Sequence, residues 1–596
     1  MRVTVFRFPD SVDAVETWLN GAGQAFATRV VRGPSKRELQ WVLDVAELGY
    51  PIQFVRLSLG PLFPAVPCEL YVDAALCLQL PHVEADGRVC LGEASLGCDF
   101  DDPVGAVARA LQRFKTELLE LSANEDWKRA HLHDERLAYW NRFCSQRQKS
   151  PRGRPRPSAT LVQMEQVDDW AEGRIAAYIP AGTRHRKIDG QIVTLGSSDP
   201  VELARRHGFS NGTLLKGCAA FVRLPGDLEW TPSNWPKDFR QLDALVFAAT
   251  GGAHTVANWL QDVGWLDKSE GADEILARNR LPGGTMPLLV VLCHGSELYG
   301  YQISQSTVSL VTAPHAAPLQ IARIDPAWSI TRDHRLEQLT IRRTRRVLVL
   351  GCGSLGSPLI DVLARSGVGK IDVVDSQAMA SENVSRHLLG LSSARINKAL
   401  AVAARMTKEI PGVEIEGFSD DARNWVSSNC QPGRYDLVVD CTAESSVRTF
   451  LARTRGELIG DAPLIHAWVE PFCAAAHVVA TTLENPWPIA DPAGTLVNVA
   501  DYSNAAVRVK LPACSDGFHP YGSADILQAA GFAAERVLAV VDGGLKDSIV
   551  WSFVRAKAFF DELNLPIKTS PLVPVDGTAR DGVLLTRTLS AVLFAP

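Results

Sequence analysis

The chain has 596 residues, which is too long for a single hydrophobic core, so about three or four domains are expected. Its composition is globular, with 46% hydrophobic, 21% charged and 7% aromatic residues, and its net charge of −6 offers no broad basic field for nucleic acid. No stretch approaches the roughly 18 apolar residues of a membrane span, and the first residues lack the apolar core of a signal peptide. We therefore expect a cytoplasmic protein that binds neither membranes nor nucleic acid directly.

The N-terminal 144 residues are predicted to form a small α+β domain. Segments with helical periodicity flank a group of short apolar runs, which Pro-rich turns separate. The predicted helices are 11–19, with Ser11 as N-cap, 103 to about 121 and about 127–143, and the predicted strands are 39–45, 52–59 and 69–72.

A basic, Pro-rich segment at residues 145–157 lacks apolar periodicity and is predicted to be an extended linker. An anion-binding tail is the alternative interpretation. Residues 158–330 follow, and apolar runs such as 244–249 and 287–293 favour strands in an α/β connecting domain. We find no chemical motif in that domain.

The third region, residues 331–596, contains a nucleotide-binding pattern. A buried-strand pattern, Val347–Leu350, leads into Gly351-Cys-Gly-Ser-Leu-Gly356, and a helix and a second strand follow. Gly351 permits a tight turn, Gly353 lets the backbone approach a phosphate, and Gly356 lets the helix pack on the strand. The second strand ends at Asp375, whose carboxylate can accept a hydrogen bond from a ribose hydroxyl.

The residues after Asp375 separate two nucleotide chemistries. A hydride-transfer enzyme does not need the polar and cationic side chains of Asn383, Arg386 and Lys398. An enzyme that cleaves ATP between its α- and β-phosphates does, because charge builds on the phosphorus and on the leaving pyrophosphate. Arg386 can fork onto phosphate oxygens, Lys398 adds a compact charge, and Asn383 can orient a phosphate. An ordinary surface helix remains the alternative for Lys398, but the set favours ATP over a dinucleotide-dependent oxidoreductase.

A further predicted strand, residues 435–440, ends in Asp440-Cys441-Thr442. A carboxylate at the carboxyl edge of a parallel sheet faces the ligand crevice. Mg²⁺ prefers one or two carboxylates together with phosphates. Asp440 is therefore predicted to bind Mg²⁺ beside ATP, whereas Asp436, at the start of the strand, is predicted to face solvent.

These motifs resemble the ThiF/MoeB-like and ubiquitin-activating enzyme family over roughly residues 340–540. The resemblance implies a Rossmann-like adenylation fold that uses MgATP to adenylate a C-terminal carboxylate. It also implies a homodimer, often with an arginine contributed across the interface. The motifs that carry the resemblance are GCGSLGS at 351–357, Asp375, NVSR at 383–386, Lys398 and DCT at 440–442, and the candidate arginines are Arg342, Arg343, Arg345 and Arg346.

The chain departs from the family in places. Ala443-Glu444 stands where the family often has Asp-Asn, which leaves the metal coordination open, and His387 stands where it often has Gln. The zinc-binding cysteine pairs of many members are absent, and the chain's 12 cysteines form no CxxC pair.

Two cysteines are candidate nucleophiles. Cys514 lies in a Gly- and Pro-rich loop before a helix predicted from about Ala524, which is where the activating family often places its thioester-forming cysteine. Cys473, in an apolar run, and Cys352, inside the glycine loop, are predicted to be buried and structural.

The setting of Cys90, Leu80-Pro-His-Val-Glu-Ala-Asp-Gly-Arg-Val-Cys-Leu91, resembles the active site of ubiquitin-conjugating enzymes. In that family a Pro-rich meander and an Asp-Gly turn lead to a Cys-Leu before a helix, and an Asn eight residues before the cysteine donates to the oxyanion. Here His82 has that spacing. Its N–H is able to take the oxyanion role or to help deprotonate an attacking amine, and it is equally compatible with a structural role.

A conjugating-like domain followed by an activating-like domain resembles the bacterial fusions of type II CBASS anti-phage operons and related ubiquitin-like operons. The resemblance implies an α/β multidomain chain with an N-terminal α+β conjugating-like fold and a C-terminal Rossmann-like ThiF fold. It implies adenylation of a partner's C-terminus, capture on Cys514, transfer to Cys90 and ligation to a target lysine. The partner would be a cGAS-like nucleotidyltransferase or a ubiquitin-like protein. A sulfur-carrier adenylyltransferase and a non-enzymatic scaffold with a degenerate conjugating domain are the alternatives.

Overall fold

The structure is a computed structural model, and the chain divides into two compact units. One unit comprises Met1–Thr160, Glu165–Val201 and Asn211–Ala322, and the other comprises Leu161–Met164, Glu202–Ser210 and Arg323–Pro596. No helix of the described residues is long and apolar enough to cross a membrane. The structure describes residues 7–26, 29–32, 39–90, 99–147, 158–182, 188–206, 208–264, 286–305, 314–325, 328, 338–410, 412–501, 519–565, 567–575 and 582–594.

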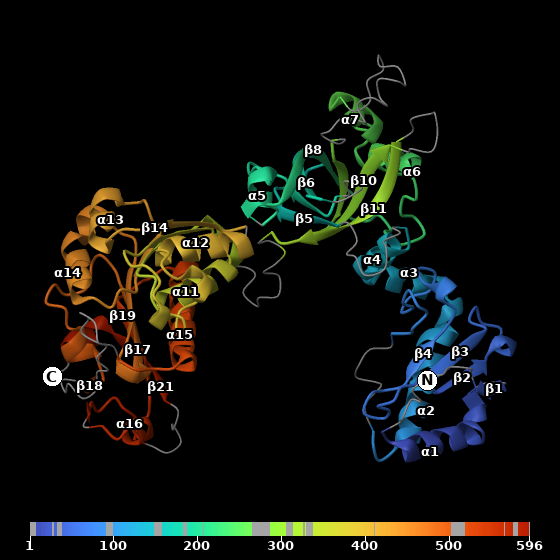
Figure 1. Ribbon diagram of the computed structural model, residues 1–596, viewed down its shortest axis with the longest axis horizontal. Coiled ribbons are helices and arrows are strands. Elements are labelled where there is room, and N and C mark those ends of the chain that lie inside the picture. The colour runs from blue at the N-terminus through green and yellow to red at the C-terminus, as the bar shows by residue number, and fades with distance from the viewer. Residues whose placement is uncertain are drawn as a thin grey trace. The chain divides into compact units, whose positions relative to one another are not determined.

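An antiparallel sheet with the strand order β1-β2-β3-β4 forms the first domain, shown in blue in Figure 1. Its inner side chains, among them Trp41 and Leu57, pack against helices α1 and α2. The predicted strands are confirmed to within two residues at each end. The elements are α1 (Pro9–Leu19), β1 (Arg29–Arg32), β2 (Leu39–Asp44), β3 (Phe54–Leu59), β4 (Glu69–Tyr71) and α2 (Pro103–Phe114).

The predicted helices of this domain are in the right places, but one begins at another residue and one is divided in two. Helix α1 starts at Pro9 after the N-cap Phe8, not after Ser11, because proline is already set for a first helical turn and needs no N–H partner there. The helix predicted for 127–143 is two helices, α3 (Glu125–Asp134) and α4 (Arg136–Arg147), which meet at Glu135.

Seven strands form a closed barrel in residues 158–323, where an α/β domain was expected. The run 287–293 is a strand as predicted, but 244–249 belongs to helix α6. Asp238 caps that helix by accepting from the Gln241 N–H, and this cap together with helical spacing of buried residues outweighs the apolar run. The elements are β5 (Ser158–Gln163), β6 (Trp170–Pro180), β7 (Gly190–Thr194), α5 (Pro200–Arg206), β8 (Gly212–Arg223), α6 (Phe239–Ala249), α7 (Val256–Asp262), β9 (Leu288–His294), β10 (Glu297–Gln305) and β11 (Pro314–Arg323).

Helix α4 joins the first domain to the barrel. The Trp140 ring packs edge-on against Trp235 and Tyr299, with ring centroids 5.2 Å apart in each case. Its indole N–H donates to the Leu319 carbonyl at 3.3 Å. The last helix of the first domain thus belongs to the core of the barrel.

An eight-stranded sheet with the order β14-β13-β12-β15-β16-β17-β19-β21 forms the C-terminal domain. The pairings from β14 to β16 are parallel, and those from β16 to β21 are antiparallel. The strands are β12 (Arg346–Leu350), β13 (Lys370–Val374), β14 (Glu414–Phe418), β15 (Leu437–Asp440), β16 (Leu464–Val469), β17 (Ala475–Thr481), β19 (Ile549–Val554) and β21 (Val583–Thr588), with a separate pair β18 (Ala500–Asp501) and β20 (Lys568–Thr569).

Helices cover both faces of this sheet. Val347 and Val349 of β12 pack with helices α11, α12 and α15, whereas Leu348 and Leu350 pack with α13 and α14. The carboxyl ends of β12, β13 and β15 therefore meet at one edge between two helical layers, as the βαβ pattern predicted. The helices are α10 (Leu339–Thr344), α11 (Gly356–Arg365), α12 (Lys398–Glu409), α13 (Ala422–Asn429), α14 (Ser445–Thr454), α15 (Ser523–Gly543), α16 (Lys557–Leu563) and α17 (Leu589–Leu593).

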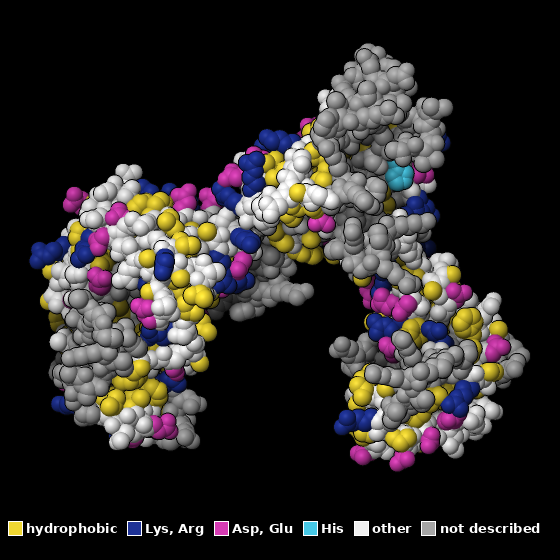
Figure 2. Space-filling view, viewed as in Figure 1, with side chains coloured by type: hydrophobic (Ala, Val, Ile, Leu, Met, Phe, Trp, Pro, Cys, Tyr) yellow, Lys and Arg dark blue, Asp and Glu magenta, His cyan; other side chains and the backbone are white. Residues whose placement is uncertain are grey.

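Basic and acidic side chains are interspersed on the face of the molecule in Figure 2. Among the described residues on that face, no continuous basic surface is visible. This distribution agrees with the small negative net charge.

Candidate functional site

The glycine loop at the end of β12 is constrained at two of its three glycines. Gly351 has φ +88°, and a Cβ there would lie 2.8 Å from the Thr442 backbone nitrogen. A Cβ on Gly356 would lie 2.1 Å from the Gly351 carbonyl oxygen. Gly353 meets nothing within 4 Å and lines the cavities described below. The first and third glycines close the turn, and the second leaves bare backbone facing open space.

A cavity of about 130 Å³ lies beyond the carboxyl ends of β12, β13 and β15. Asp375 lines it, and its two carboxylate oxygens accept from the Cys352 and Gln377 N–H groups at 2.7 Å each. These bonds fix the carboxylate and leave it lone pairs for a ribose hydroxyl. Val374, Ala422 and Val447 supply apolar walls that suit a base.

The predicted phosphate-binding residues converge on a second cavity of about 200 Å³, lined by Gly353, Asn383, Arg386 and Lys398. The Lys398 side chain is 6% exposed. Its ammonium donates to Gln377 Oε1 at 2.8 Å, and no carboxylate of the described residues forms an ion pair with it. A buried cation in this position calls for an anionic ligand. The glycine loop and the NVSR segment therefore meet as the sequence predicted.

His387 ties the NVSR segment to the glycine loop. Its Nδ1 accepts from the Leu389 N–H at 3.0 Å, which leaves Nε2–H to donate to the Cys352 carbonyl at 2.7 Å. Burial lowers the pKa of His387, so the neutral imidazole that this arrangement requires is favoured at neutral pH. The histidine that replaces the family's glutamine thus has a structural partner in the site.

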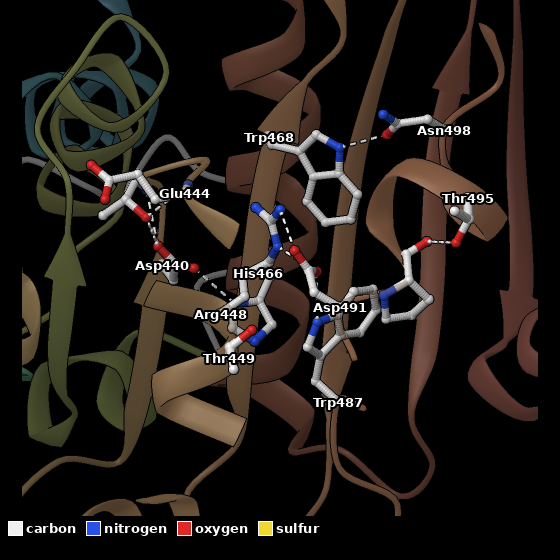
Figure 3. A network of polar contacts seen from close by, with 12 residues as sticks. Asp440, Glu444, Arg448, Thr449, His466, Trp468, Trp487, Asp491, Thr495 and Asn498 are labelled. Atoms are coloured by element: carbon white, nitrogen blue, oxygen red, sulfur yellow. Dashed lines mark hydrogen bonds and ion pairs between the residues drawn. The ribbon is translucent and has the colours of Figure 1, made fainter. Parts of the chain in front are cut away.

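Asp440 lines neither of these cavities, and its carboxylate is bonded to neighbouring side chains instead (Figure 3). One oxygen lies 2.8 Å from His466 Nδ1, and the other accepts from the N–H and hydroxyl of Thr442 at 3.0 and 2.6 Å. The residue is 1% exposed. Its assignment as a Mg²⁺ ligand stays a prediction, and its bonds in the structure fix Thr442, which lines two cavities.

A third and larger cavity, of about 750 Å³, shares Gly353 with both of the others and Arg386 with the second. Its wall includes Trp468 and the ion pair of Arg448 with Asp491, whose N–O distances are 2.8 and 2.9 Å (Figure 3). The Arg448 guanidinium also lies 5.3 Å from the Trp468 ring centroid. This cavity has room for an extended peptide beside the phosphate cavity.

The predicted cysteines fall into three settings. Cys514 lies outside the described residues, so its assignment stays a prediction. Cys352 and Cys473 are buried as predicted. Burial raises the pKa of the Cys473 thiol to about 12 and that of Cys352 well above its usual range, which makes both poor nucleophiles.

Cys90 is exposed at the end of a segment that returns alongside β4. The Asp-Gly turn before it is confirmed: Gly87 has φ +86°, and a Cβ there would lie 2.3 Å from the Val72 carbonyl. The Cys90 N–H donates to the His82 carbonyl at 2.8 Å, which places these two residues opposite each other. The cysteine is thus exposed at the end of a hydrogen-bonded loop.

The His82 ring lies in a polar cluster. Its Nε2 is 3.2 Å from His131 Nδ1, and its Nδ1 is 3.6 Å from a Glu135 carboxylate oxygen. The other Glu135 oxygen accepts from the Tyr139 hydroxyl, which itself accepts from the His82 N–H at 2.8 Å. Burial lowers the pKa of His82, against the opposing charge of Glu135. The chemical role predicted for His82 stays a prediction.

Comparison with known proteins covers both domains. Residues 327–486 match the ThiF family, and residues 15–147 match the prokaryotic E2 family B. The ATP-dependent ubiquitin transferase-like protein Cap2 of Pseudomonas aeruginosa (strain BWHPSA011 / Pa011) is 23% identical over 525 residues, which are 84% of this chain and 86% of that protein. Adenylyltransferase and sulfurtransferase MOCS3 of Mus musculus is 33% identical over 138 residues, 22% of this chain and 30% of that protein. A crystal structure of E. coli MccB with MccA-N7isoASN is 16% identical in sequence, and the match covers 36% of this chain and 62% of the MccB chain, with a TM-score of 0.26.

The chain is a fusion of a prokaryotic E2 domain with a ThiF domain. It has the make-up of an ATP-dependent ubiquitin transferase-like enzyme, with adenylation in the ThiF domain and conjugation in the E2 domain. The predicted α/β multidomain architecture is confirmed at both ends of the chain.

The four arginines before the ThiF glycine loop are not equivalent. Arg342 is 1% exposed and forms a two-point ion pair with Asp542, at 2.7 Å for each bond. Arg345 and Arg346 both contact Asp436, at 3.4 and 3.8 Å. Asp436, predicted to face solvent, is therefore an ion-pair partner. Arg343 is exposed.

Several ThiF-domain residues line the cavities without having been identified from the sequence. Trp468 and Asp491 lie far from the glycine loop along the chain, and only the fold brings them to it. Tyr521 follows Cys514 by seven residues and contacts the glycine loop directly. An aromatic residue at an irregular position carries no periodic signal, so nothing in the local sequence distinguished it.

Proposed function

We propose that this chain uses MgATP to adenylate the C-terminal carboxylate of a partner protein and then transfers the acyl group through two cysteines to a target amine. The observation that carries the proposal is the continuity of three cavities at one sheet edge. The first suits a nucleoside and the second suits phosphates. The third has room for a peptide tail beside the phosphates.

In the first step, Asp375 accepts from the ribose, while Asn383, Arg386 and Lys398 surround the phosphates. A carboxylate oxygen of the tail attacks the α-phosphorus from the larger cavity, the bond to the β-phosphate oxygen breaks, and pyrophosphate leaves. Arg386 lines both cavities, so its charge is available to the developing negative charge at the point of attack.

Mg²⁺ would neutralise phosphate charge during this step. The carboxylates lining the nucleotide cavity are Asp375, Asp420, Asp421 and Glu444. Arg423 pairs with Asp421 and lowers its pKa to about 2, and Asp375 is held by backbone N–H groups. Glu444, exposed at the cavity edge, would hold the metal together with ATP oxygens, and the predicted Asp440, whose carboxylate is bonded to His466 and Thr442, would support it through Thr442.

The later steps conserve the energy of the adenylate. The Cys514 thiolate attacks the acyl carbon and AMP leaves, giving a thioester. The Cys90 thiolate takes the acyl group and frees Cys514. A lysine amine then attacks the Cys90 thioester, an isopeptide bond forms as the carbon–sulfur bond breaks, and the proton lost by the amine ends on the freed Cys90 thiol.

The partner we propose is a cGAS-like nucleotidyltransferase of a CBASS anti-phage system or a ubiquitin-like protein. The support is the likeness over 84% of the chain to the Cap2 protein and the order of the two domains. We further propose a homodimer through the ThiF domain, with Arg343 as the arginine that reaches its partner, in the bacterial cytoplasm.

A sulfur-carrier adenylyltransferase is the second candidate, favoured by the likeness to MOCS3 over 22% of the chain. That function would use the ThiF domain alone. It predicts that Cys90→Ala leaves activity unchanged, and it gives no role to the exposed Cys90 loop.

The test co-expresses the chain with the product of a neighbouring nucleotidyltransferase or ubiquitin-like gene and separates adducts on a non-reducing gel. We expect a thiol-sensitive adduct that Cys514→Ala abolishes, and Cys90→Ala should retain a Cys514 adduct but form no isopeptide product. Cys430→Ala is the matched control, because burial raises the pKa of that thiol to about 11 and it should not react. A thiol-sensitive adduct that remains when Cys514→Ala and Cys90→Ala are combined would contradict the proposal.

A further inference from the structure

Tyr521 occupies the junction of the phosphate cavity and the larger cavity. It lines both, and it shares this position with Gly353, Ser354 and Arg386. Any carboxylate that passes from the larger cavity to the phosphates must pass this group of residues.

Two contacts connect Tyr521 to residues of the nucleotide site. The Arg386 guanidinium carbon lies 4.8 Å from the centroid of the Tyr521 ring, within the range of a cation–π interaction. The Tyr521 hydroxyl and the Ser354 hydroxyl are 2.7 Å apart, and either can be the donor. One side chain therefore touches both the glycine loop and the arginine that faces the phosphates.

Helix α15 holds Tyr521 in place. The Gly522 N–H donates to Asp525 Oδ2 at 3.0 Å at the start of that helix. The Ser523 hydroxyl donates to the carbonyl of Ser385, the residue before Arg386. The backbone and the side chain of the NVSR segment are thus both anchored to the same helix start.

We propose that Tyr521 is a positioning residue for adenylation, which holds the Arg386 guanidinium toward the ATP phosphates and sets the glycine loop against it through Ser354. This role rests on the adenylation proposed above. An arginine with several rotatable bonds loses little further freedom on binding phosphate when a flat ring already fixes its plane. The contribution is therefore specific to ligands that carry phosphates beyond the nucleoside.

The test measures binding of MgATP and of adenosine to the full chain by titration calorimetry. Tyr521→Leu removes the ring and should weaken MgATP about tenfold, which is within the range of a partly buried cation–π contact. Adenosine, which has no phosphate, should bind within about twofold of wild type. Tyr521→Trp, which keeps an aromatic face under Arg386, should restore most of the MgATP affinity.

A double-mutant cycle with Arg386→Ala identifies the partner. Once Arg386 is absent, Tyr521→Leu should cause no further loss of MgATP affinity, because the two residues act as one unit. An equal loss in both backgrounds would overturn the proposal, and so would an equal weakening of adenosine and MgATP, which indicates a merely structural role. Wild-type chain that binds adenosine and MgATP with the same affinity would instead overturn the adenylation itself.

Discussion

His82 of the E2 domain has a backbone conformation that few residues adopt, with φ +60°. Non-glycine residues held in this region persist only where their surroundings fix them, and they concentrate at functional sites. Here the surroundings are explicit: His82 bonds through its carbonyl to Cys90, through its N–H to Tyr139 and through its ring to His131. The cysteine's position therefore depends on helices α3 and α4.

A pH profile tests whether the His82 ring also serves as a base. The charged and titratable groups around it are Glu135, His131, Glu117 and Arg142. Burial lowers the pKa of His82 below its ordinary value of 6.5, so the neutral, basic form dominates at pH 7 and is lost as the pH falls through the lowered pKa. We expect the discharge of an acyl group from Cys90 to free lysine to slow over that acidic range.

The Glu135 carboxylate is one of the groups that raise the pKa of His82. Glu135→Gln should therefore move the acidic limb of the rate profile to lower pH. Cys90 can be loaded directly with the mercaptoethanesulfonate thioester of a fluorescent glycyl peptide, which bypasses adenylation. His133→Gln, a change at another histidine of α3, is the matched control. An acidic limb that stays in place in Glu135→Gln would contradict a base role for His82.

At the scale of elements, helix α14 contributes both to the wall of the larger cavity and to the hydrophobic core of the ThiF domain. Arg448 and Asp491 have side chains 8% and 7% exposed, and Asp491 also accepts from the Trp487 indole N–H at 3.1 Å. Burial works to raise the pKa of Asp491, but hydrogen bonds from Arg448, Ser445 and Trp487 outweigh it and hold the pKa below its usual value. The pair thus joins α14 to the segment before β18.

Removing one partner leaves the other charge buried. Asp491→Ala should lower the free energy of unfolding by about 3–5 kcal/mol, measured by urea denaturation at neutral pH. Asp491→Asn is the matched control, because asparagine tolerates the φ of +49° and keeps an acceptor, and it should lower the free energy of unfolding by less.

The pH dependence of this pair is a second readout. The difference in the free energy of unfolding between wild type and Asp491→Asn should be complete above the unfolded pKa of about 4 and vanish as the pH falls through the lowered pKa of Asp491. Equal stability of wild type and Asp491→Ala at neutral pH would show that the pair contributes nothing net.

The elements predicted correctly are those in which the local sequence pattern matches the packing that the fold imposes on the segment. Val347–Leu350 is apolar on both faces because helices cover both, and Gly351 and Gly356 after it meet steric limits that no other residue satisfies. The run 244–249 gave the wrong element because a short apolar run does not separate a strand from a buried helix. Tyr521 and Trp468 could not be assigned to the site, because only the crossing of distant segments places them there.

At the scale of the whole molecule, the E2 domain and the barrel share a hydrophobic core. Tyr139, Trp140 and Phe143 of α4 lie in one buried cluster with barrel residues that include Trp235 and Tyr299. The same helix contacts the Cys90 loop, since Arg142 pairs with Glu84 and donates to the Val83 carbonyl at 3.3 Å. The barrel, for which no chemical motif is found, therefore supports the helix that holds the Cys90 loop.

This shared core makes a prediction about local stability. Trp140→Ala should destabilise by about 3–5 kcal/mol, the usual cost of deleting a buried large aromatic side chain. Because α4 lies in this core and also bonds to the Cys90 loop, hydrogen exchange should accelerate in loop residues 82–90 of the E2 domain and in the barrel strands β8 and β9 together. Trp487→Ala, an equally buried tryptophan of the ThiF domain, should instead accelerate exchange in strands β16 and β17. If Trp140→Ala left the Cys90 loop as protected as in wild type, the loop would be held without the barrel, and the barrel's role would have to lie elsewhere.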